Sequence, residues 1–535
     1  MLIMITFPKE KHAHDLLHLV QILILLSLTA ALASVLRLRR NAKKALVIDP
    51  PLPPGPRGLP LVGYLPFLSP YLYEDFSKLA TVYGPIFKFW MGNKLGVVVT
   101  SAPLVKEVVR DQDVVFANRG FSTCGYVATH GGHDIAFAPY GPEWKKLRKI
   151  FVREMSNNTV LAGNLSSLRR EEVKKSIRQI YKDMIDTPVD IRSLAFQMAI
   201  NSVISMTISA SEGDNAIINV VEFQKAVEEL LALIGKLNVS DVLPAIARFD
   251  IQGIEKDTRK ITLAIEAIFD YAIAKRNENA KNHEAKEIMR KDFLQVLLEL
   301  HHEHEDHTSE TSISMPEIKA LLMDALLGAT DTTTTVVEWT MTEILKHPEI
   351  MSKVQEELTQ IVGLNNNVEE VHLSKLNYLN AVVKETFRLH PPLPLLVPRC
   401  PSQSAIVGGY LIPKGCTVFL NVWAIQRDPS VWENPLEFQP ERFLMTNAEH
   451  QLNHNFSGNN FSYFPFGAGR RICAGVSLGE KMLMLMLASM LHSFEWKLPL
   501  GANLDLSNKS GMIIKKKEPL LSIPTPRLSH SLLHI

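Results

Sequence analysis

The stretch from Phe464 to Gly475 holds the cysteine with the most distinctive surroundings in the chain, Cys473. Glycines on both sides of it allow tight backbone turns that aim amide N–H groups at the sulfur. An apolar run over 478–491 follows, and a helix beginning there would favour a thiolate over a thiol. A thiolate is a soft, electron-donating ligand for a transition metal. The alternative is a buried structural cysteine beside a glycine-rich turn.

A second candidate for chemistry is an acid next to a hydroxyl, Asp331 and Thr332, in an apolar helix expected to begin near Glu317. Adjacent helical residues point about 100° apart, so the two side chains cannot both face one reaction centre. Only one of them can therefore act directly there, and an acid beside a hydroxyl suits the passage of protons. The alternative is that the hydroxyls of residues 332–335 bond back to preceding helical carbonyls and bend the helix, and both can hold together.

These stretches resemble the cytochrome P450 family. Phe466, Gly469, Arg471, Cys473 and Gly475 fill every defined position of the family's haem-binding signature, F-x-x-G-x-R-x-C-x-G. Similarity extends from the Pro-rich segment at 50–60 to residues 524–528, and it is strongest to plant endoplasmic-reticulum members that oxidise specialised metabolites. The resemblance implies a mainly α fold with a small β-sheet subdomain, forming a single large haem domain behind an N-terminal transmembrane helix.

The resemblance further implies one haem b, iron protoporphyrin IX, with Cys473 as the metal ligand. A thiolate-ligated iron that cleaves dioxygen is the chemistry of a monooxygenase. Guanidinium groups suit carboxylates, so three arginines would hold the two haem propionates. The implied cofactor-binding residues are Trp144, Arg148, Arg399, Phe466, Gly469, Arg471, Cys473 and Gly475, with Trp144 and Arg148 four apart on one helical face.

Residues 328–333 resemble the family's oxygen-activation segment. The resemblance implies that Asp331 and Thr332 are the catalytic pair, with Thr332 facing the reaction centre and Asp331 relaying protons from outside. One departure is Ala329, where many relatives carry glycine, and its methyl group could narrow the groove for oxygen. The resemblance also implies that Glu385, Arg388 and Arg442 form a buried ionic network beneath the haem. Taken alone, the spacing of Glu385 and Arg388 is common on helix surfaces and would favour an exposed ion pair.

Composition excludes some other classes of protein. Lys and Arg number 57 against 56 Asp and Glu, so no global attraction to nucleic acid is expected. The chain has 4 cysteines and no C-x-x-C pair, which argues against a disulfide-stapled secreted protein.

The N-terminal region predicts a membrane anchor. Residues 16–36 are apolar and long enough to cross a bilayer, and a basic cluster at 37–44 follows, which places that side in the cytoplasm. A cleaved signal peptide is the alternative. We therefore expect a lumenal tail at 1–15, a single-pass anchor in the endoplasmic reticulum membrane at 16–36, a basic and Pro-rich hinge at 37–60, and a cytosolic haem domain at 61–535.

Most of the remaining chain shows helical periodicity, for example at Phe293, Val296 and Leu297, while short β-like runs occur at 96–100 and 416–421. The histidine-rich segment 301–314 is expected to be an exposed loop, with metal binding as the alternative.

Two partners follow from the resemblance, NADPH-cytochrome P450 reductase as the electron source and cytochrome b5 as an accessory donor. A basic face is a candidate for docking the acidic redox partner, and a plain solvated helix face is the alternative. It comprises Lys145, Lys146, Lys149 and Arg153.

The substrate is expected to be lipophilic, because the segments that resemble the family's pocket walls are mostly apolar. They are 116–135, 223–249, Met323, Leu327, 393–397, Met512 and Ile513. Our first interpretation is a terpenoid, sesquiterpenoid-like substrate. The alternative is a flavonoid or other phenolic, on which His130 and His133 could stack or hydrogen-bond. Two rival functions are a reductase-independent haem-thiolate isomerase, which the acid and hydroxyl pair argues against, and a non-catalytic haem sensor.

Overall fold

The computed structural model describes residues 50–120, 122–156, 160–208, 220–281, 291–305, 312–444, 454–509 and 511–528. The predicted tail, the anchor and the basic part of the hinge up to residue 49 lie outside the described residues.

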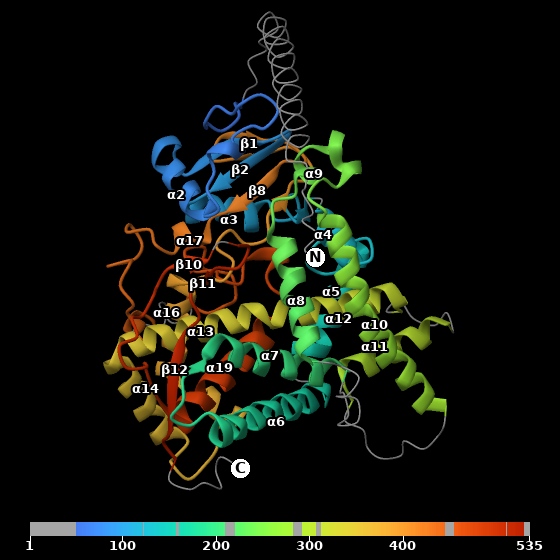
Figure 1. The fold of residues 1–535 in the computed structure, drawn as a ribbon. Coiled ribbons are helices and arrows are strands. Elements are labelled where there is room, and N and C mark those ends of the chain that lie inside the picture. Colours follow the sequence, from blue (N-terminus) through green and yellow to red (C-terminus); the bar gives the residue numbers. More distant parts are fainter. Residues whose placement is uncertain are drawn as a thin grey trace, which may run out of the picture.

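Helices make up most of the described chain (Figure 1). They are α2 (Leu72–Tyr83), α3 (Ala102–Lys106), α4 (Thr123–Ala128), α5 (Pro142–Ser156), α6 (Val160–Asp183), α7 (Ile191–Ile208), α8 (Val220–Gly235), α9 (Val239–Val242), α10 (Ile254–Lys281), α11 (Phe293–Glu305), α12 (Met315–Ala329), α13 (Asp331–Lys346), α14 (Pro348–Ile361), α15 (Glu370–Leu373), α16 (Asn377–Leu389), α17 (Val422–Ile425) and α19 (Val476–Ser493). Short helical turns of other pitch are η2 (Leu65–Phe67), η3 (Glu107–Asp111), η4 (Pro244–Phe249), η5 (Pro440–Phe443) and η6 (Gly469–Arg471).

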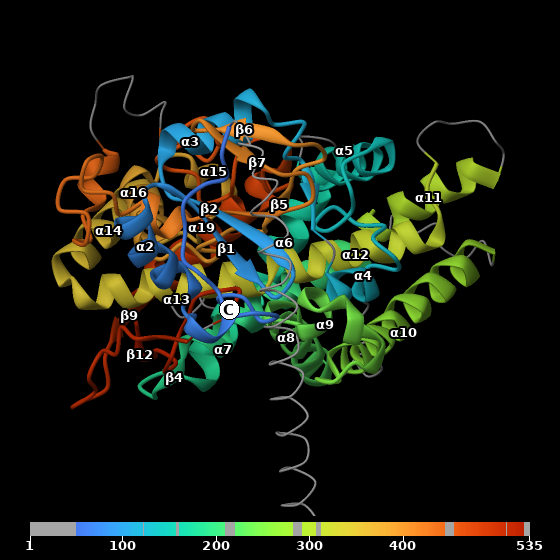
Figure 2. The same ribbon diagram turned by 90° about the horizontal axis from the view of Figure 1, so that it is seen from above.

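The helices α12 and α13 run through the middle of the molecule (Figure 2). Both contact α7, and α13 also packs on α16 and α19. The apolar faces of α7, α13 and α19 meet in the largest hydrophobic core, which includes Ile200, Val337 and Leu487. Burial of this apolar surface is the main force that fixes the central helices relative to one another.

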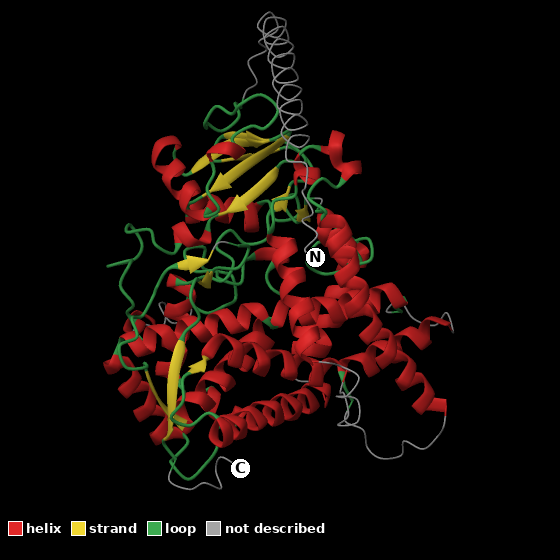
Figure 3. Cartoon of the chain, viewed as in Figure 1, coloured by secondary structure: helices red, strands yellow, loops and turns green. Residues whose placement is uncertain are grey.

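The strands gather at one end and along one side of the helical body (Figure 3). They are β1 (Ile86–Met91), β2 (Lys94–Val99), β3 (Asn118–Arg119), β4 (Val189–Asp190), β5 (Arg399–Cys400), β6 (Ala405–Val407), β7 (Tyr410–Ile412), β8 (Thr417–Leu420), β9 (Phe494–Lys497), β10 (Asn508–Lys509), β11 (Lys515–Lys516) and β12 (Leu521–Pro526). The main sheet has the order β1-β2-β8-β5-β3, and smaller sheets are β4-β12-β9, β6-β7 and β10-β11. This confirms a mainly α fold with a small β subdomain.

Both β-like runs of the sequence are confirmed as strands. They form β2 and β8, which lie side by side and pair in parallel from Gly96 with Thr417 to Val99 with Leu420. The three valines of β2 and Val418, Phe419 and Leu420 of β8 are buried, which explains why β-branched and apolar residues fill both runs.

The loop expected at 301–314 is only partly correct. Helix α11 continues through the histidines to Glu305, and His301 Nδ1 lies 2.7 Å from the Ile313 carbonyl oxygen. Three histidines, His301, His302 and His304, are therefore part of the helix. Among the described residues, no group of three His, Cys, Asp or Glu side chains is arranged to hold a metal ion.

The Pro-rich segment packs on the domain from Pro50 onward. The Lys88 backbone N–H donates to the Pro54 carbonyl at 2.8 Å, and the Leu411 N–H donates to the Pro51 carbonyl at 2.8 Å. Within the described part of the chain, one helix, α7, is long and apolar enough to span a membrane, but 72% of it is buried inside the protein. We therefore read α7 as a core helix.

Candidate active site

The loop before α19 holds Cys473 in a tight turn. The Cys473 N–H donates to the Phe466 carbonyl at 2.9 Å, and the Gly475 N–H donates to the Cys473 sulfur at 3.3 Å. Gly467 and Gly469 have φ values of 76° and 68°, the left-handed region where glycine is favoured. An amide N–H aimed at the sulfur is the arrangement expected from the sequence.

Gly469 also has no room for a side chain. A Cβ atom there would overlap the Val109 carbonyl oxygen and lie 2.7 Å from Asp113 Oδ1. The Asp113 carboxylate accepts the Arg470 N–H at 2.9 Å and thereby ties the cysteine loop to the turn that follows η3. Phe466 packs against Phe387 and Phe456, with ring centroids 5.0 Å away in each case. The loop is thus fixed from both sides.

The Cys473 side chain is accessible, yet burial raises the pKa of its thiol. This combination arises when a side chain faces a space inside the protein instead of the outer surface. The Gly475 N–H and the positive charge of Arg148 act in the opposite direction but do not outweigh burial. Iron in contact with the sulfur would favour the thiolate over the thiol.

Four arginines gather near this cysteine. Arg119 on β3 and Arg399 on β5 are directly paired across the sheet, and burial and the charges of Arg399 and Arg471 hold the pKa of Arg119 well below its ordinary value. Burial lowers the pKa of Arg399 and of Arg471 to about 10 in each case. Like charges opposite each other destabilise a sheet unless an anion balances them. This cluster fits the two propionates of a haem.

Trp144 lies between two of these arginines. The Arg471 guanidinium carbon is 4.4 Å from the centroid of the indole ring and that of Arg148 is 5.5 Å away, while the indole N–H donates to the Ile135 carbonyl at 3.0 Å. Trp144 and Arg148 thus share one face of α5, as the sequence predicts.

Arg148 and Arg471 differ in their partners. Arg471 donates to the carbonyl oxygens of Ala117, Ile135 and Ala138. These bonds connect the cysteine loop to the segments around Ala117 and 135–138. Among the described residues, Arg148 has no hydrogen-bond or ion-pair partner, and burial lowers its pKa. A partly buried guanidinium without a partner, close to Cys473, is suited to an anionic ligand.

The segment with Asp331 and Thr332 is a break between two helices, not one continuous helix. Helix α12 begins at Met315, capped by Ser314 and Glu317, and ends at Ala329, and α13 begins at Asp331. Thr332 Oγ1 donates to the Gly328 carbonyl at 2.7 Å, and Thr334 Oγ1 donates to the Thr330 carbonyl at 2.9 Å. The back-bonding considered for residues 332–335 is therefore present at Thr332 and Thr334, whereas the buried Thr335 Oγ1 has no hydrogen-bond partner among the described residues.

Thr332 and Asp331 lie on different sides of the helix. Asp324, Gly328 and Thr332 follow at intervals of four and are accessible, although residues around them are buried. Asp331 is 2% exposed, and its Oδ1 lies 2.6 Å from the Lys515 ammonium on β11. The two side chains diverge as expected, while their catalytic roles stay predictions.

A buried ionic network joins α16 to η5. Arg388 Nε and Nη2 donate to the two Glu385 oxygens at 2.7 and 2.8 Å, and Arg442 Nε lies 3.1 Å from Glu385 Oε1. Arg388 also donates to the carbonyls of Gln426, Pro435 and Glu437. The predicted network of Glu385, Arg388 and Arg442 is confirmed, and every nitrogen of the Arg388 guanidinium donates to a carboxylate or carbonyl oxygen.

Sequence reasoning missed Arg119, Asp134, Asp324 and Lys515. Asp324 accepts the Ile135 N–H at 2.7 Å and holds the loop after α4 onto α12. Burial and the neighbouring charge of Asp134 raise the pKa of Asp324 well above its ordinary value. A signal for Asp324 exists, because it is an acid within the apolar run 320–329. Arg119 and Lys515 depend on strand contacts that local spacing does not reveal.

The segment 116–135 is held in place by contacts with helices α9 and α10. Thr123 Oγ1 donates to Asp241 Oδ1 on α9 at 2.5 Å, and His130 Nε2 lies 3.0 Å from Glu266 Oε1 on α10. Met323 is 2% exposed and belongs to the core, whereas Leu327 is half-buried. His130 is thus engaged with α10, which weakens the idea that it stacks on a substrate ring.

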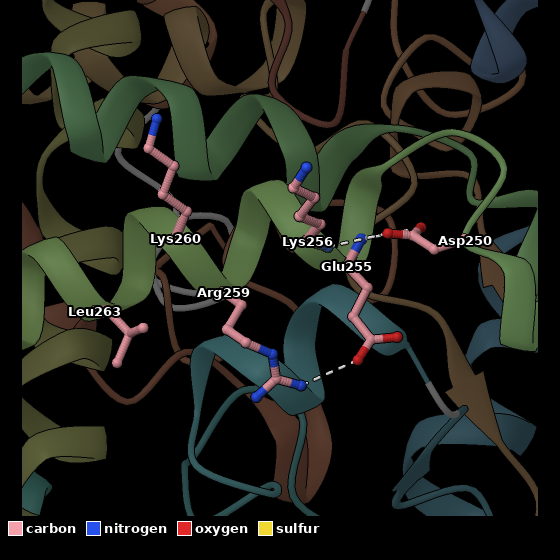
Figure 4. A pocket seen from close by; sticks show the side chains of 6 residues that line it. All are labelled: Asp250, Glu255, Lys256, Arg259, Lys260 and Leu263. Atoms are coloured by element: carbon pink, nitrogen blue, oxygen red, sulfur yellow. Dashed lines mark hydrogen bonds and ion pairs between the residues drawn. The ribbon is translucent and has the colours of Figure 1, made fainter.

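Part of the positive charge of the proposed docking face is balanced by neighbouring carboxylates. Lys146 pairs with Glu317 at 2.7 Å, and Arg153 pairs with Glu154, so Lys145 and Lys149 remain its exposed cations. A separate surface pocket is lined by residues of α10 and by Asp250, and Arg259 pairs there with Glu255 at 3.0 Å (Figure 4). It contains none of the predicted site residues.

Comparison with known proteins identifies the family. Residues 53–523 match the family model of the cytochrome P450 proteins. A flavonoid 3'-monooxygenase of Crocosmia x crocosmiiflora is 36% identical over 513 residues, covering 94% of this chain and 97% of that protein. A flavonoid 3',5'-hydroxylase of Solanum melongena is 38% identical over 488 residues, covering 89% and 91%.

Solved structures agree with the sequence comparisons. A zebra fish cytochrome P450 with progesterone has a TM-score of 0.70 and 26% identity, covering 86% of this chain and 100% of that one. The chain belongs to the cytochrome P450 family. It is a haem-b monooxygenase, an oxidoreductase whose family uses a haem of the kind that the cysteine loop and the arginine cluster fit.

Proposed function

We propose that the chain hydroxylates a flavonoid or a related phenolic, with electrons from NADPH delivered by NADPH-cytochrome P450 reductase. The observation that carries this proposal is near full-length similarity to flavonoid 3'- and 3',5'-hydroxylases at 36% and 38% identity. A 3,9-dihydroxypterocarpan 6A-monooxygenase of Glycine max, 35% identical over 521 residues, also has a phenolic substrate in its name. These names favour the phenolic alternative over our first, sesquiterpenoid interpretation.

The Cys473 sulfur would hold the haem iron, and Arg119, Arg148, Arg399 and Arg471 would balance the propionates. The geometry of this cofactor site would be maintained by Trp144, Phe466, Gly469 and Gly475. The bound haem supplies the oxygen-activating chemistry of a thiolate-ligated iron. Among the chain's own residues, Thr332 would present a hydroxyl to the reaction site, and Asp331 would pass protons toward it.

We further propose the cellular setting. Residues 1–15 would be lumenal, 16–36 would form a single-pass anchor in the endoplasmic reticulum membrane, 37–60 would be the hinge, and 61–535 would be the cytosolic haem domain. Cytochrome b5 would serve as an accessory electron donor. Lys145 and Lys149 are exposed and available to an acidic redox partner.

The test is turnover of a substrate panel by the membrane-bound protein with NADPH and its reductase. Flavanones, flavones and flavonols form one arm, and sesquiterpene hydrocarbons form the other. The expected product carries one added oxygen on a flavonoid ring. Oxidation of the terpene arm alone would overturn the substrate class, and product formation without reductase would point to an isomerase instead.

A further inference from the structure

One carboxylate joins the start of α12 to α5. Glu317 Oε1 lies 2.7 Å from the Lys146 ammonium, and Glu317 Oε2 accepts the Ser314 N–H at 2.7 Å. Lys146 also donates to the Ser312 carbonyl at 3.1 Å. Burial alone would raise the pKa of Glu317, but Lys146 and the Ser314 N–H hold that pKa below its ordinary value. Glu317 is therefore ionised, and it takes part in the helix cap and the ion pair at the same time.

The same two helices meet a second time at the peptide groups of Ile135. Trp144 on α5 donates its indole N–H to the Ile135 carbonyl at 3.0 Å, and Asp324 on α12 accepts the Ile135 N–H at 2.7 Å. Asp324 comes seven residues after Glu317, which is about two helical turns along α12. The pocket segment 116–135 is therefore held by both helices at its last residue.

These contacts form a closed frame of α5, α12 and the pocket segment. Lys146 and Trp144 lie two residues apart on α5, so the ion pair and the Ile135 bonds connect neighbouring parts of the same helices. When the contact between Lys146 and Glu317 opens, the start of α12 is released from α5. A change in the spacing of α5 and α12 then acts on Ile135, because its N–H and its carbonyl are bonded to different helices.

Lys146 also belongs to the helix that carries the candidate docking face. Its side chain is 25% exposed, and its neighbours Lys145 and Lys149 are exposed cations that attract an acidic surface. A carboxylate of a docked partner can compete with Glu317 for the ammonium, because a partly exposed ion pair is weak enough to exchange. Lys146 therefore has two anionic partners to choose between, which gives the frame two states.

We propose that Lys146 couples docking of the acidic redox partner to the substrate pocket. The inference rests on the proposed partner, NADPH-cytochrome P450 reductase, and adds regulation to the same site. In the free protein, Lys146 holds α5 against α12 and the pocket segment is fixed at Ile135. In the docked complex, Lys146 turns to a partner carboxylate and the frame opens. A molecule in the pocket is then bound less tightly, because it must order the loosened segment again.

The first experiment measures equilibrium binding of clotrimazole, an azole that binds haem iron, to the full-length haem-loaded protein in vesicles, from the shift of the Soret band. Saturating reductase should raise the Kd about fivefold, the low end of the usual coupling between two sites. Lys146→Met should show the raised Kd without reductase, and reductase should change it no further. Lys149→Met should bind reductase less tightly but keep the full change at saturation. A change that persists in Lys146→Met would overturn the proposal.

The second experiment uses Glu317→Gln, which tests the frame without reductase and leaves every cation of the docking face in place. Glutamine still accepts the Ser314 N–H as a capping residue but does not attract Lys146 by charge. The Kd for clotrimazole should therefore rise by the same factor as in Lys146→Met. The double variant Lys146→Met/Glu317→Gln should show no larger rise than either single variant, because both remove one contact.

Glu349→Gln is the matched control for Glu317→Gln. Glu349 also lies in the first turn of a helix, α14, but it is 63% exposed and pairs with His347 instead of α5. This control should leave the Kd for clotrimazole unchanged. An unchanged Kd in a folded Glu317→Gln protein contradicts the proposal even if reductase binds. Absence of reductase binding to the wild-type protein, measured by its co-flotation with the vesicles, would refute the proposed partner and the coupling with it.

Discussion

The Glu385 carboxylate accepts two hydrogen bonds from the Arg388 guanidinium, at 2.7 and 2.8 Å, and neither side chain has exposed surface. Arg442 Nε adds a third contact at 3.1 Å, so one carboxylate joins α16 to the segment that precedes the cysteine loop.

Glu385→Ala should prevent formation of the haem-bound protein. The substitution leaves Arg388 as an unbalanced buried cation, which costs about 3 to 5 kcal/mol. The reduced, carbon monoxide-bound protein should lack the red-shifted Soret band of a thiolate-ligated haem. Glu441→Ala is the control, because Glu441 is exposed and pairs with Lys353 at the surface. A Glu385→Ala protein with the full band would contradict the structural role of this network.

Gly469→Ala should disrupt the cysteine loop more strongly than its backbone angle alone explains. The matched control is Gly501→Ala, because Gly501 has φ 76° but open space around a Cβ atom. The control should lower the free energy of unfolding by about 1 kcal/mol, because a positive φ is less favourable for alanine than for glycine. Gly469→Ala adds a collision with the Val109 carbonyl. Unfolding curves and the carbon monoxide spectrum of both variants measure the difference, and equal effects would show that the close approach is unimportant.

The cysteine loop was predictable because its determinants are contiguous. Tight turns, a sulfur and the start of a helix all lie within 464–478, so residue types alone indicate the local geometry. Glu385 and Arg388 were predictable as a pair for the same reason. Their burial, and the contact with Arg442, follow from packing of α16 on η5, which local spacing does not specify.

Contacts between distant segments could not be predicted in this way. Arg119 faces Arg399 because β3 pairs with β5, and the register of two-residue strands leaves almost no periodic signal. Asp331 meets Lys515 for a similar reason, since β11 is also two residues long. The break at Thr330 was not predicted because the apolar residues of 318–327 and of 336–345 favour one long helix. The back-bonds of Thr332 and Thr334 depend on side-chain rotamers, which the sequence does not reveal.

The Thr332→Ala variant should still bind haem, but it should use NADPH to form peroxide instead of product. The Thr332 hydroxyl lies on the accessible side of the central helices, whereas that of Thr334 is buried and bonded to the Thr330 carbonyl. Loss of a group that hands on protons should lower product per NADPH by at least about tenfold and raise peroxide release correspondingly. Thr334→Ala should change stability but leave this ratio near the wild-type value. An unchanged ratio in Thr332→Ala would refute the catalytic assignment.

His492 should make stability depend on pH in the weakly acidic range. It is fully buried in α19 with Nε2 3.0 Å from the Asn366 carbonyl, and burial lowers its pKa to about 4. An unfolded histidine takes up a proton near pH 6.5, so the unfolded state binds more protons than the folded state between these two values. The free energy of unfolding should therefore fall by about 1.4 kcal/mol for each pH unit as pH drops from 6.5 toward 4. Denaturant titrations across this range should show that His492→Gln removes this contribution. An identical pH slope in the variant would mean that His492 is already protonated in the folded protein.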